Sequence, residues 1–299
     1  MSLSLQVKKF INSEHTGDYV EILLPGFPDK EGETTPEPAK IHYIEAGSGE
    51  PMLLVHTVGQ SFYTWRNVFE QLSQSYRVIA VDLLGHGYSS RPLQFDYTIR
   101  EQSQALELFM DAMGIQSAHI VAFSMGALYA LDLCIRAPHR VGRMVLSSPG
   151  GLTPQMPLLV RMIDSSLFGG LACRLYTYKS VENVLQDCLF DLTVLTNEVL
   201  EGYYSTIADN LSRKAIQLSL HNFDEQEVEK DLRTVDNEVL ILWGAEDKWH
   251  APDSSELYHA ALKNAQFGVV RNAGHLMHEE KPQRFVEAVR EYIPVLVEE

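Results

Sequence analysis

The stretch Val121-Ala122-Phe123-Ser124-Met125-Gly126-Ala127 decides how the rest of this chain is interpreted. A largely apolar run at 119–123 ends abruptly in Ser124, and a segment with the composition of a helix follows at 127–137. A serine in this position can be held on a tight strand-to-helix turn of the G-x-S-x-G type, with its hydroxyl exposed. The stretch therefore predicts a nucleophile for covalent acyl chemistry.

The predicted turn departs from the G-x-S-x-G pattern at its first position, where Ala122 stands in place of glycine. The turn needs a small residue there to avoid a steric clash. Because alanine adds only one methyl group, we expect the turn to tolerate it.

Length, composition and charge exclude several classes of protein. The 299 residues, 45% of them hydrophobic, are long for one core and short for two independent catalytic domains. The 24 basic and 40 acidic side chains give a net charge of −16. Such a field repels phosphate backbones and anionic lipids, so we expect neither a nucleic acid nor a membrane as a partner.

The sequence also indicates a compartment. No apolar run approaches the roughly 20 residues that span a bilayer, and the first ten residues lack a basic region followed by an apolar core. The three cysteines, Cys134, Cys173 and Cys188, form no C-x-x-C pair. A sparse and odd cysteine count is typical of a reducing compartment, so we expect a cytoplasmic protein.

Strand and helix patterns alternate along most of the chain. Strand patterns lie at 19–24, 41–46, 52–56, 77–82, 119–123, 143–147, 238–243 and 266–270. The segments 52–56 and 77–82 have the largely apolar composition of strands that are buried on both faces. Helical patterns lie between them at 99–113 and 252–262, and a last one follows at 282–297. This alternation predicts an α/β protein with a mostly parallel, doubly wound sheet and helices on both faces.

The alternation fails between residues 152 and 234, which hold several helical patterns and no clear strand. We interpret residues 1–150 and 235–299 as the core and residues 151–234 as a helical cap inserted after the sixth strand. Ligands bind at the carboxyl ends of the strands in open α/β sheets, so this cap would roof the site. Its apolar and aromatic side chains suit a small, largely apolar acyl or aryl substrate.

Two later strand ends offer partners for Ser124. A serine hydroxyl needs a base, and the base needs an orienting acid. Asp247 follows a strand through a glycine turn, and His275 follows the last strand, which is the chain order Ser, Asp, His. Glu246 is a competing acid, and His278 is a rival base that we expect on the surface or behind the site.

An oxyanion hole needs two backbone N–H groups aimed at the developing negative oxygen. One should come from Met125, which follows the nucleophile at a helix N-terminus. The other should come from the loop at 56–61, which follows the strand at 52–56.

Four segments in this order resemble the α/β-hydrolases of the esterase, thioesterase and cofactor-free peroxidase type. Besides the Ser124 turn and the two partner positions, His56-Thr57-Val58-Gly59 resembles the family's H-G-x-G oxyanion loop, and residues 82–89 resemble its structural D-x-x-G-x-G-x-S segment. The resemblance covers residues 41–294. It implies that Ser124, Asp247 and His275 are nucleophile, acid and base, and that Val58 and Met125 donate to the oxyanion.

Thr57 stands where the family's loop has glycine. If its hydroxyl faces the site, it supplies an extra donor or narrows the acyl pocket; otherwise it distorts the hole or packs against the top of the sheet. We take Thr57 and Phe123, which precedes the nucleophile, as the candidate substrate contacts.

The identity of the nucleophile separates neighbouring chemistries. Haloalkane dehalogenases and epoxide hydrolases of this fold carry aspartate at the position of Ser124. The long glycine-rich oxyanion loop of the C–C hydrolases is absent, which weakens that interpretation and leaves it open. No H-E-x-x-H spacing or dinucleotide-binding G-x-G-x-x-G is present, so we expect no metal and no cofactor.

The leading hypothesis is a serine hydrolase that cleaves a carboxylic ester, thioester or lactone through an acyl-enzyme on Ser124. One alternative is a ligand receptor or regulatory protein that keeps the fold with little turnover, because fold does not fix function. Another is acyl transfer or perhydrolysis by the same triad. The expected partner is a small acyl substrate, bound by a monomer or homodimer.

Overall fold

The computed structural model of the chain describes residues 17–26, 35–150, 177–250 and 255–295. Part of the expected cap, residues 151–176, lies outside these ranges, as does Cys173.

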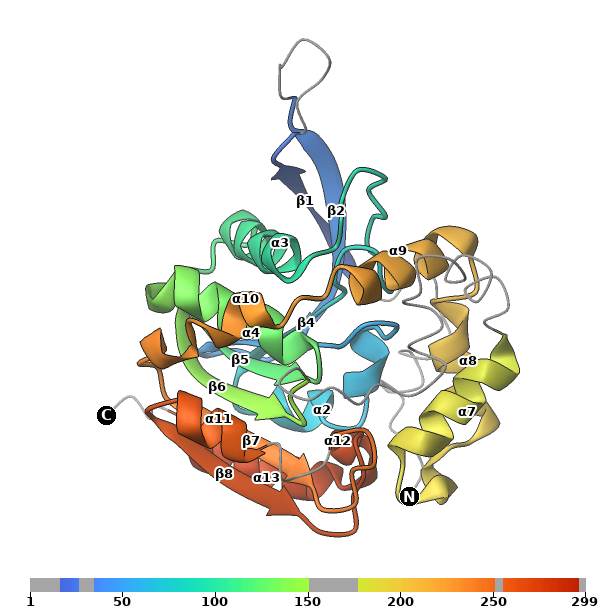
Figure 1. The fold of residues 1–299 in the computed structure, drawn as a ribbon, viewed down its shortest axis with the longest axis vertical. Helices are drawn as coiled ribbons and strands as arrows, with labels where there is room; N and C mark the ends of the chain where they lie inside the picture. Colours follow the sequence, from blue (N-terminus) through green and yellow to red (C-terminus); the bar gives the residue numbers. More distant parts are fainter. Residues whose placement is uncertain (1–16, 27–34, 151–176, 251–254, 296–299) are drawn as a thin grey trace.

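One eight-stranded sheet organises the molecule, in the order β1-β2-β4-β3-β5-β6-β7-β8 (Figure 1). The first two strands pair antiparallel, as do β2 and β4, and the other neighbours are parallel. The mostly parallel α/β sheet expected from the sequence is therefore confirmed. The strands are β1 (Asp18–Leu24), β2 (Glu37–Ala46), β3 (Pro51–Val55), β4 (Arg77–Val81), β5 (Ala118–Phe123), β6 (Val141–Ser147), β7 (Val239–Gly244) and β8 (Ala265–Val270).

Helices cover both faces of this sheet, which explains why its central strands, such as β3, β4 and β7, are nearly continuous buried apolar runs. In β3, Leu53 and Val55 belong to the core on one face, and Met52 and Leu54 belong to the core on the other. The first core is completed by α3 (Ile99–Ala112), α4 (Gly126–Arg136) and Tyr258 of α11 (Ser255–Ala261), and the second by α2 (Phe69–Leu72) and α13 (Pro282–Tyr292).

The cap is helical and follows the sixth strand, as expected. Between β6 and β7 the described residues form α7 (Tyr178–Cys188), α8 (Asn197–Ser205), α9 (Asn210–His221) and the short α10 (Gln226–Glu229). In Figure 1, α7 and α8 lie together at one side of the molecule, and the chain returns through α9 and α10 towards α4. Within the described ranges, no helix is long and apolar enough to cross a bilayer.

The cap packs closely on loops at the carboxyl ends of the strands. A Cβ atom on Gly85 would lie 2.7 Å from the Cβ of Ala215 in α9, and one on Gly202 in α8 would lie 2.3 Å from the ring of Tyr63. Both positions need glycine because the neighbouring side chain already occupies the space of a Cβ atom. The cap helices thus cover the carboxyl ends of the strands, where Ser124 follows β5.

Candidate active site

Ser124 stands on a strained turn between β5 and α4. Its φ angle is +53°, a left-handed conformation that side chains other than glycine rarely adopt. Gly126 permits this turn, because a Cβ there would lie 2.4 Å from the carbonyl oxygen of His56. The methyl group of Ala122 is fully buried in the core, where the residue pairs with Val55 and Leu146.

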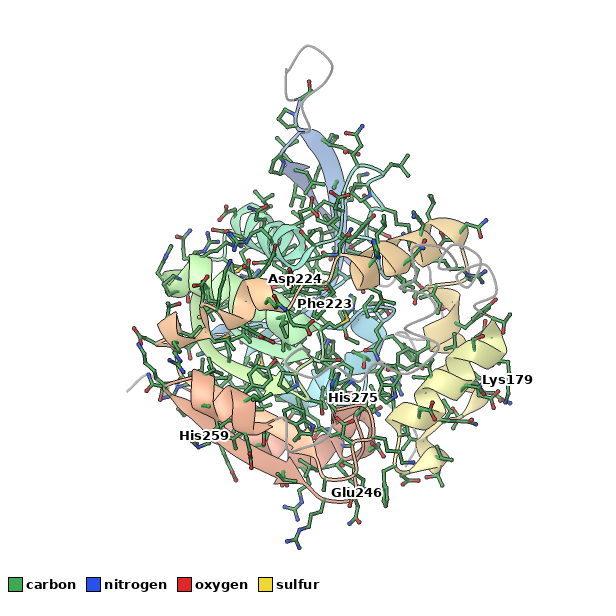
Figure 2. All side chains as sticks on the ribbon, in the orientation of Figure 1. Lys179, Phe223, Asp224, Glu246, His259 and His275 are labelled. Carbon is green, nitrogen blue, oxygen red and sulfur yellow. The ribbon has the colours of Figure 1, made fainter. Side chains whose placement is uncertain are left out.

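The structure brings Ser124, His275 and Asp247 together as a chain of hydrogen bonds. Nε2 of His275 lies 3.1 Å from Oγ of Ser124, and Nδ1 of His275 lies 2.8 Å from Oδ2 of Asp247. All three residues are buried. Figure 2 labels His275 on the loop after β8. This is the geometry in which a base can take the serine proton while a carboxylate fixes the tautomer of the base.

Asp247 is held ionised by groups on both of its oxygens. Oδ1 accepts hydrogen bonds from the backbone N–H groups of Trp249 (2.9 Å) and His250 (3.0 Å), while Oδ2 faces His275. Burial alone would raise the pKa of Asp247, but His275 and the N–H group of His250 outweigh it and lower the pKa below its usual value. The carboxylate is therefore available to stabilise a protonated His275.

The two rival residues lie elsewhere. The carboxylate of Glu246, also labelled in Figure 2, accepts a 2.9 Å hydrogen bond from the N–H of Ala273 and so braces the loop before His275. His278 is not on the surface: it is fully buried, and its Nε2 lies 2.7 Å from Oγ1 of Thr64. Burial lowers the pKa of His278 to about 3, so it is a neutral residue behind the site.

Phe123 corrects one sequence expectation. Its ring is fully buried and contacts the imidazoles of His275 and His278, each at a centroid distance of 4.8 Å. No surface of Phe123 is left for a substrate in this structure. The residue supports the position of His275 instead.

Sequence reasoning missed two residues that contact His275. The indole of Trp249 stacks on the imidazole at 5.8 Å, and the ring of His250 lies 5.2 Å away. Burial lowers the pKa of His250 to about 4, so it adds no positive charge beside His275 near neutral pH. The available signal was their spacing, since aspartate often accepts from N–H groups two and three residues later.

Glu280, also missed, fastens the cap to the His275 loop. Its Oε1 accepts from the N–H groups of Phe190 (2.9 Å) and Asp191 (2.7 Å), and its Oε2 accepts from that of Gly274 (2.7 Å). The N–H of His275 in turn donates to the carbonyl of Cys188 at 2.8 Å. The end of α7 and the loop of the histidine are therefore held as one unit.

Replacing Glu280 with glutamine should destabilise this unit. The NH₂ group of the glutamine would face backbone N–H donors in place of one carboxylate oxygen. Those buried N–H groups would lose their acceptor, which costs about 1–3 kcal/mol of folding free energy. We expect an earlier midpoint in urea unfolding. The matched control is Glu287→Gln on the exposed face of α13, where the change should stay within about 0.5 kcal/mol. Equal midpoints for the two variants would contradict the fastening role of Glu280.

The loop after β3 is rigidly braced. His56 donates from Nδ1 to the carbonyl of Thr57 (2.7 Å) and accepts at Nε2 from the N–H of Leu83 (3.0 Å). Val58 is half-buried, and its N–H has no hydrogen-bond partner within the described part of the chain. The N–H of Met125 does have a partner, the hydroxyl of Thr57.

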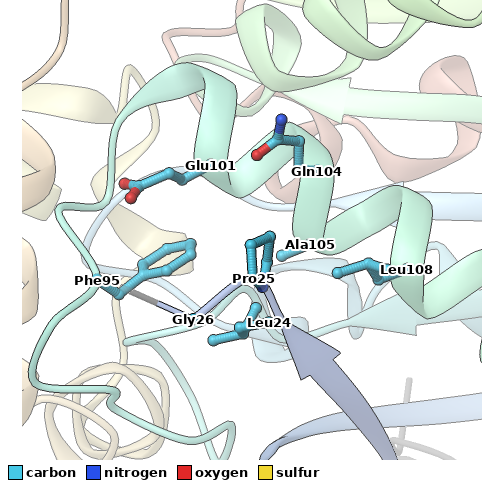
Figure 3. Close-up of a pocket in the computed structure, with 8 residues that line it drawn as sticks. All are labelled: Leu24, Pro25, Gly26, Phe95, Glu101, Gln104, Ala105 and Leu108. Atoms are coloured by element: carbon cyan, nitrogen blue, oxygen red, sulfur yellow. The ribbon is translucent and has the colours of Figure 1, made fainter. Parts of the chain in front are cut away.

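Other features lie apart from this site. Across the described residues, no three histidine, cysteine or acidic side chains are arranged to hold a metal ion. A small pocket between β1 and α3 (Figure 3) is lined by Leu24, Phe95 and Leu108, among others, and by none of the residues around Ser124.

Comparison with known proteins identifies the family of this fold. A family model described as alpha/beta hydrolase fold matches residues 50–282. The chain is 29% identical over 257 residues to a 2-hydroxy-6-oxo-6-phenylhexa-2,4-dienoate hydrolase of Comamonas testosteroni. The aligned region covers 82% of this chain and 88% of that protein.

Two solved structures have the same fold. A mutant meta-cleavage product hydrolase superposes with a TM-score of 0.74 at 26% identity, over 85% of this chain and 94% of that one. An enol-lactonase from Burkholderia xenovorans also gives 0.74, at 19% identity, over 85% and 96% of the two chains.

Proposed function

The chain belongs to the α/β-hydrolase family, and we propose that within it the protein is a serine hydrolase of small, largely apolar carboxylic esters, thioesters or lactones. One observation carries the proposal: the hydrogen-bond chain from Ser124 through His275 to Asp247.

The proposed reaction has two halves. His275 takes the proton of Ser124 as Oγ attacks the substrate carbonyl, and the N–H groups of Met125 and Val58 stabilise the resulting oxyanion. The tetrahedral intermediate then expels the alcohol or thiol, which receives the proton from His275. Water, deprotonated by His275, cleaves the acyl-enzyme and releases the acid and free Ser124. Asp247 stabilises the imidazolium in both halves.

The surroundings of Ser124 support an apolar substrate. Met125 belongs to one apolar cluster with cap residues that include Leu189, Ile216 and Leu220, and the half-buried Val58 packs against this cluster. An acyl or aryl group entering between the oxyanion loop and the cap would be removed from water, at about 25 cal/mol per Å² of apolar surface.

Hydrolysis of a carbon–carbon bond is the second candidate. It is favoured by the similarity to proteins named as hydrolases of 2-hydroxy-6-oxo-dienoates. Against it stands the loop His56-Thr57-Val58-Gly59, which lacks the glycine-rich sequence of C–C hydrolases.

The test begins with a fluorophosphonate probe and intact-protein mass spectrometry. We expect one time-dependent adduct on the native protein and none on Ser124→Ala. Turnover is then compared between p-nitrophenyl esters of increasing acyl length and 2-hydroxy-6-oxo-6-phenylhexa-2,4-dienoate. An unlabelled native protein would contradict the proposal.

The substrate comparison separates the remaining alternatives. Faster turnover of the dienoate would favour the second candidate. Labelling without turnover of either class would favour a receptor or regulatory role. Products formed with added alcohol or peroxide distinguish acyl transfer and perhydrolysis from hydrolysis.

A further inference from the structure

We propose that the hydroxyl of Thr57 is a third hydrogen-bond donor of the oxyanion hole, which accepts from Met125 in the free enzyme and donates to the substrate oxygen during reaction. This inference rests on the proposed function of Ser124.

The hydroxyl of Thr57 lies directly beside the nucleophile. The N–H of Met125, the residue after Ser124, donates to Oγ1 of Thr57 at 3.2 Å. Thr57, Met125 and Ser124 are 7%, 6% and 5% exposed, so this contact is nearly shielded from water. Thr57 therefore neither packs against the top of the sheet nor turns its hydroxyl away from the site.

The position of Thr57 is fixed by two hydrogen bonds to its carbonyl oxygen. Its carbonyl accepts from Nδ1 of His56 (2.7 Å) and from the N–H of Gln60 (3.3 Å). The Ser124 turn is pressed against this loop, since a Cβ on Gly126 would lie 2.4 Å from the carbonyl oxygen of His56. Oγ1 of Thr57 and the nitrogen of Met125 are therefore held together by the contact between the loop after β3 and the Ser124 turn. An oxyanion hole requires donors that are positioned in this way before the substrate binds.

The hydroxyl keeps its own proton free for a substrate. A threonine hydroxyl has one donor and two acceptor positions. The N–H of Met125 uses one acceptor position, and no acceptor within the described ranges takes the proton of Oγ1. The hydroxyl proton is thus available to an oxygen atom that enters beside Met125.

The observed separation leaves room for a third oxygen. An oxyanion about 2.8 Å from both atoms forms an ordinary triangle with the 3.2 Å separation of Oγ1 and the Met125 nitrogen. The distance of 3.2 Å is at the long end of the range for an N–H···O hydrogen bond. The existing hydrogen bond is therefore weak, and the N–H of Met125 can donate to the oxyanion instead. A small rotation then aims the hydroxyl proton at the negative oxygen.

The test compares Thr57→Val, which keeps the shape and removes the hydroxyl, with Thr57→Ser, which keeps the hydroxyl. On the best ester, Thr57→Val should lower kcat about 10²–10³-fold with little change in KM, because the lost hydrogen bond forms mainly in the transition state. Thr57→Ser should retain most of the rate. A trifluoromethyl ketone, whose adduct carries an oxyanion, should bind Thr57→Val more weakly by a similar factor.

The matched control is Thr206→Val, which removes a buried hydroxyl that donates to the carbonyl of Tyr203 in the cap. Its rate should remain that of the native protein. If the native protein fails to react with fluorophosphonate, the proposed function and this inference fall together. If it reacts and turns over ester while Thr57→Val is equally fast or faster, only the third donor is refuted.

Discussion

Asp247→Asn should lower kcat/KM about 10⁴-fold while leaving the fold intact. The reason lies in what each carboxylate oxygen contacts. Oδ1 faces two backbone N–H donors, those of Trp249 and His250, so the asparagine oxygen must take that position. The NH₂ group then faces Nδ1 of His275 and donates to it. His275 is forced to carry its proton on Nε2, where it can no longer accept one from Ser124.

The measurement is ester turnover at saturating and limiting substrate, with circular dichroism and thermal unfolding to establish that the variant is folded. Glu246→Gln is the matched control, because its carboxylate is adjacent in sequence and accepts from Ala273 rather than from His275. Its rate should stay close to that of the native protein. A large loss in Glu246→Gln together with an active Asp247→Asn would reverse the assignment of the acid.

Arg66→Met should destabilise the protein by about 3–5 kcal/mol, because it leaves the carboxylate of Glu279 buried without its partner. The Arg66 Nη2 and Glu279 Oε2 atoms are 2.5 Å apart, and both side chains are at most 3% exposed. The same carboxylate accepts from Tyr203 of the cap and from Thr64. The loss is measured as the free energy of unfolding in urea.

The double variant Arg66→Met with Glu279→Met is the control for this effect. Replacing both charges by apolar groups of similar size removes the unpaired carboxylate, so much of the lost stability should return. If the double variant loses more free energy of unfolding than the two single variants lose together, the pairing of the two charges is not the origin of the effect.

This ion pair also predicts a pH dependence. Burial would raise the pKa of Glu279, but Arg66 outweighs it and lowers the pKa below the ordinary value of 4.5. The pair therefore contributes its full stability above about pH 4.5, and the contribution is lost as the pH falls through the lower value of the folded state. The stability gap between the native protein and Arg66→Met should narrow in that acid range.

Much of the fold and the candidate triad could be predicted without coordinates. Continuous apolar runs such as 52–56 indicated strands buried on both faces, and helical patterns between them indicated parallel pairing. Parallel strands end at one edge, so polar residues after β5, β7 and β8 had to converge there. This is why Ser124, Asp247 and His275 could be grouped from strand order alone, as the structure then brings them together.

Side-chain partners across long sequence separations could not be predicted in this way. The hydroxyl of Thr57 meets a backbone N–H 68 residues later, His278 meets Thr64 across 214 residues, and Glu280 meets the cap across 90. Periodicity reports which face of an element is buried but not which neighbour it contacts.

The sequence by itself determined the α/β class, the insertion point of the cap and the grouping of Ser124, Asp247 and His275 at neighbouring strand ends, because these follow from local patterns and from the geometry of parallel strands. Tertiary structure alone decided that Phe123 lies behind His275, that His278 is buried and that the Thr57 hydroxyl lies on the N–H of Met125. Those outcomes depend on how separate loops pack within a few tenths of an ångström, a distance scale on which hydrogen bonds form or fail.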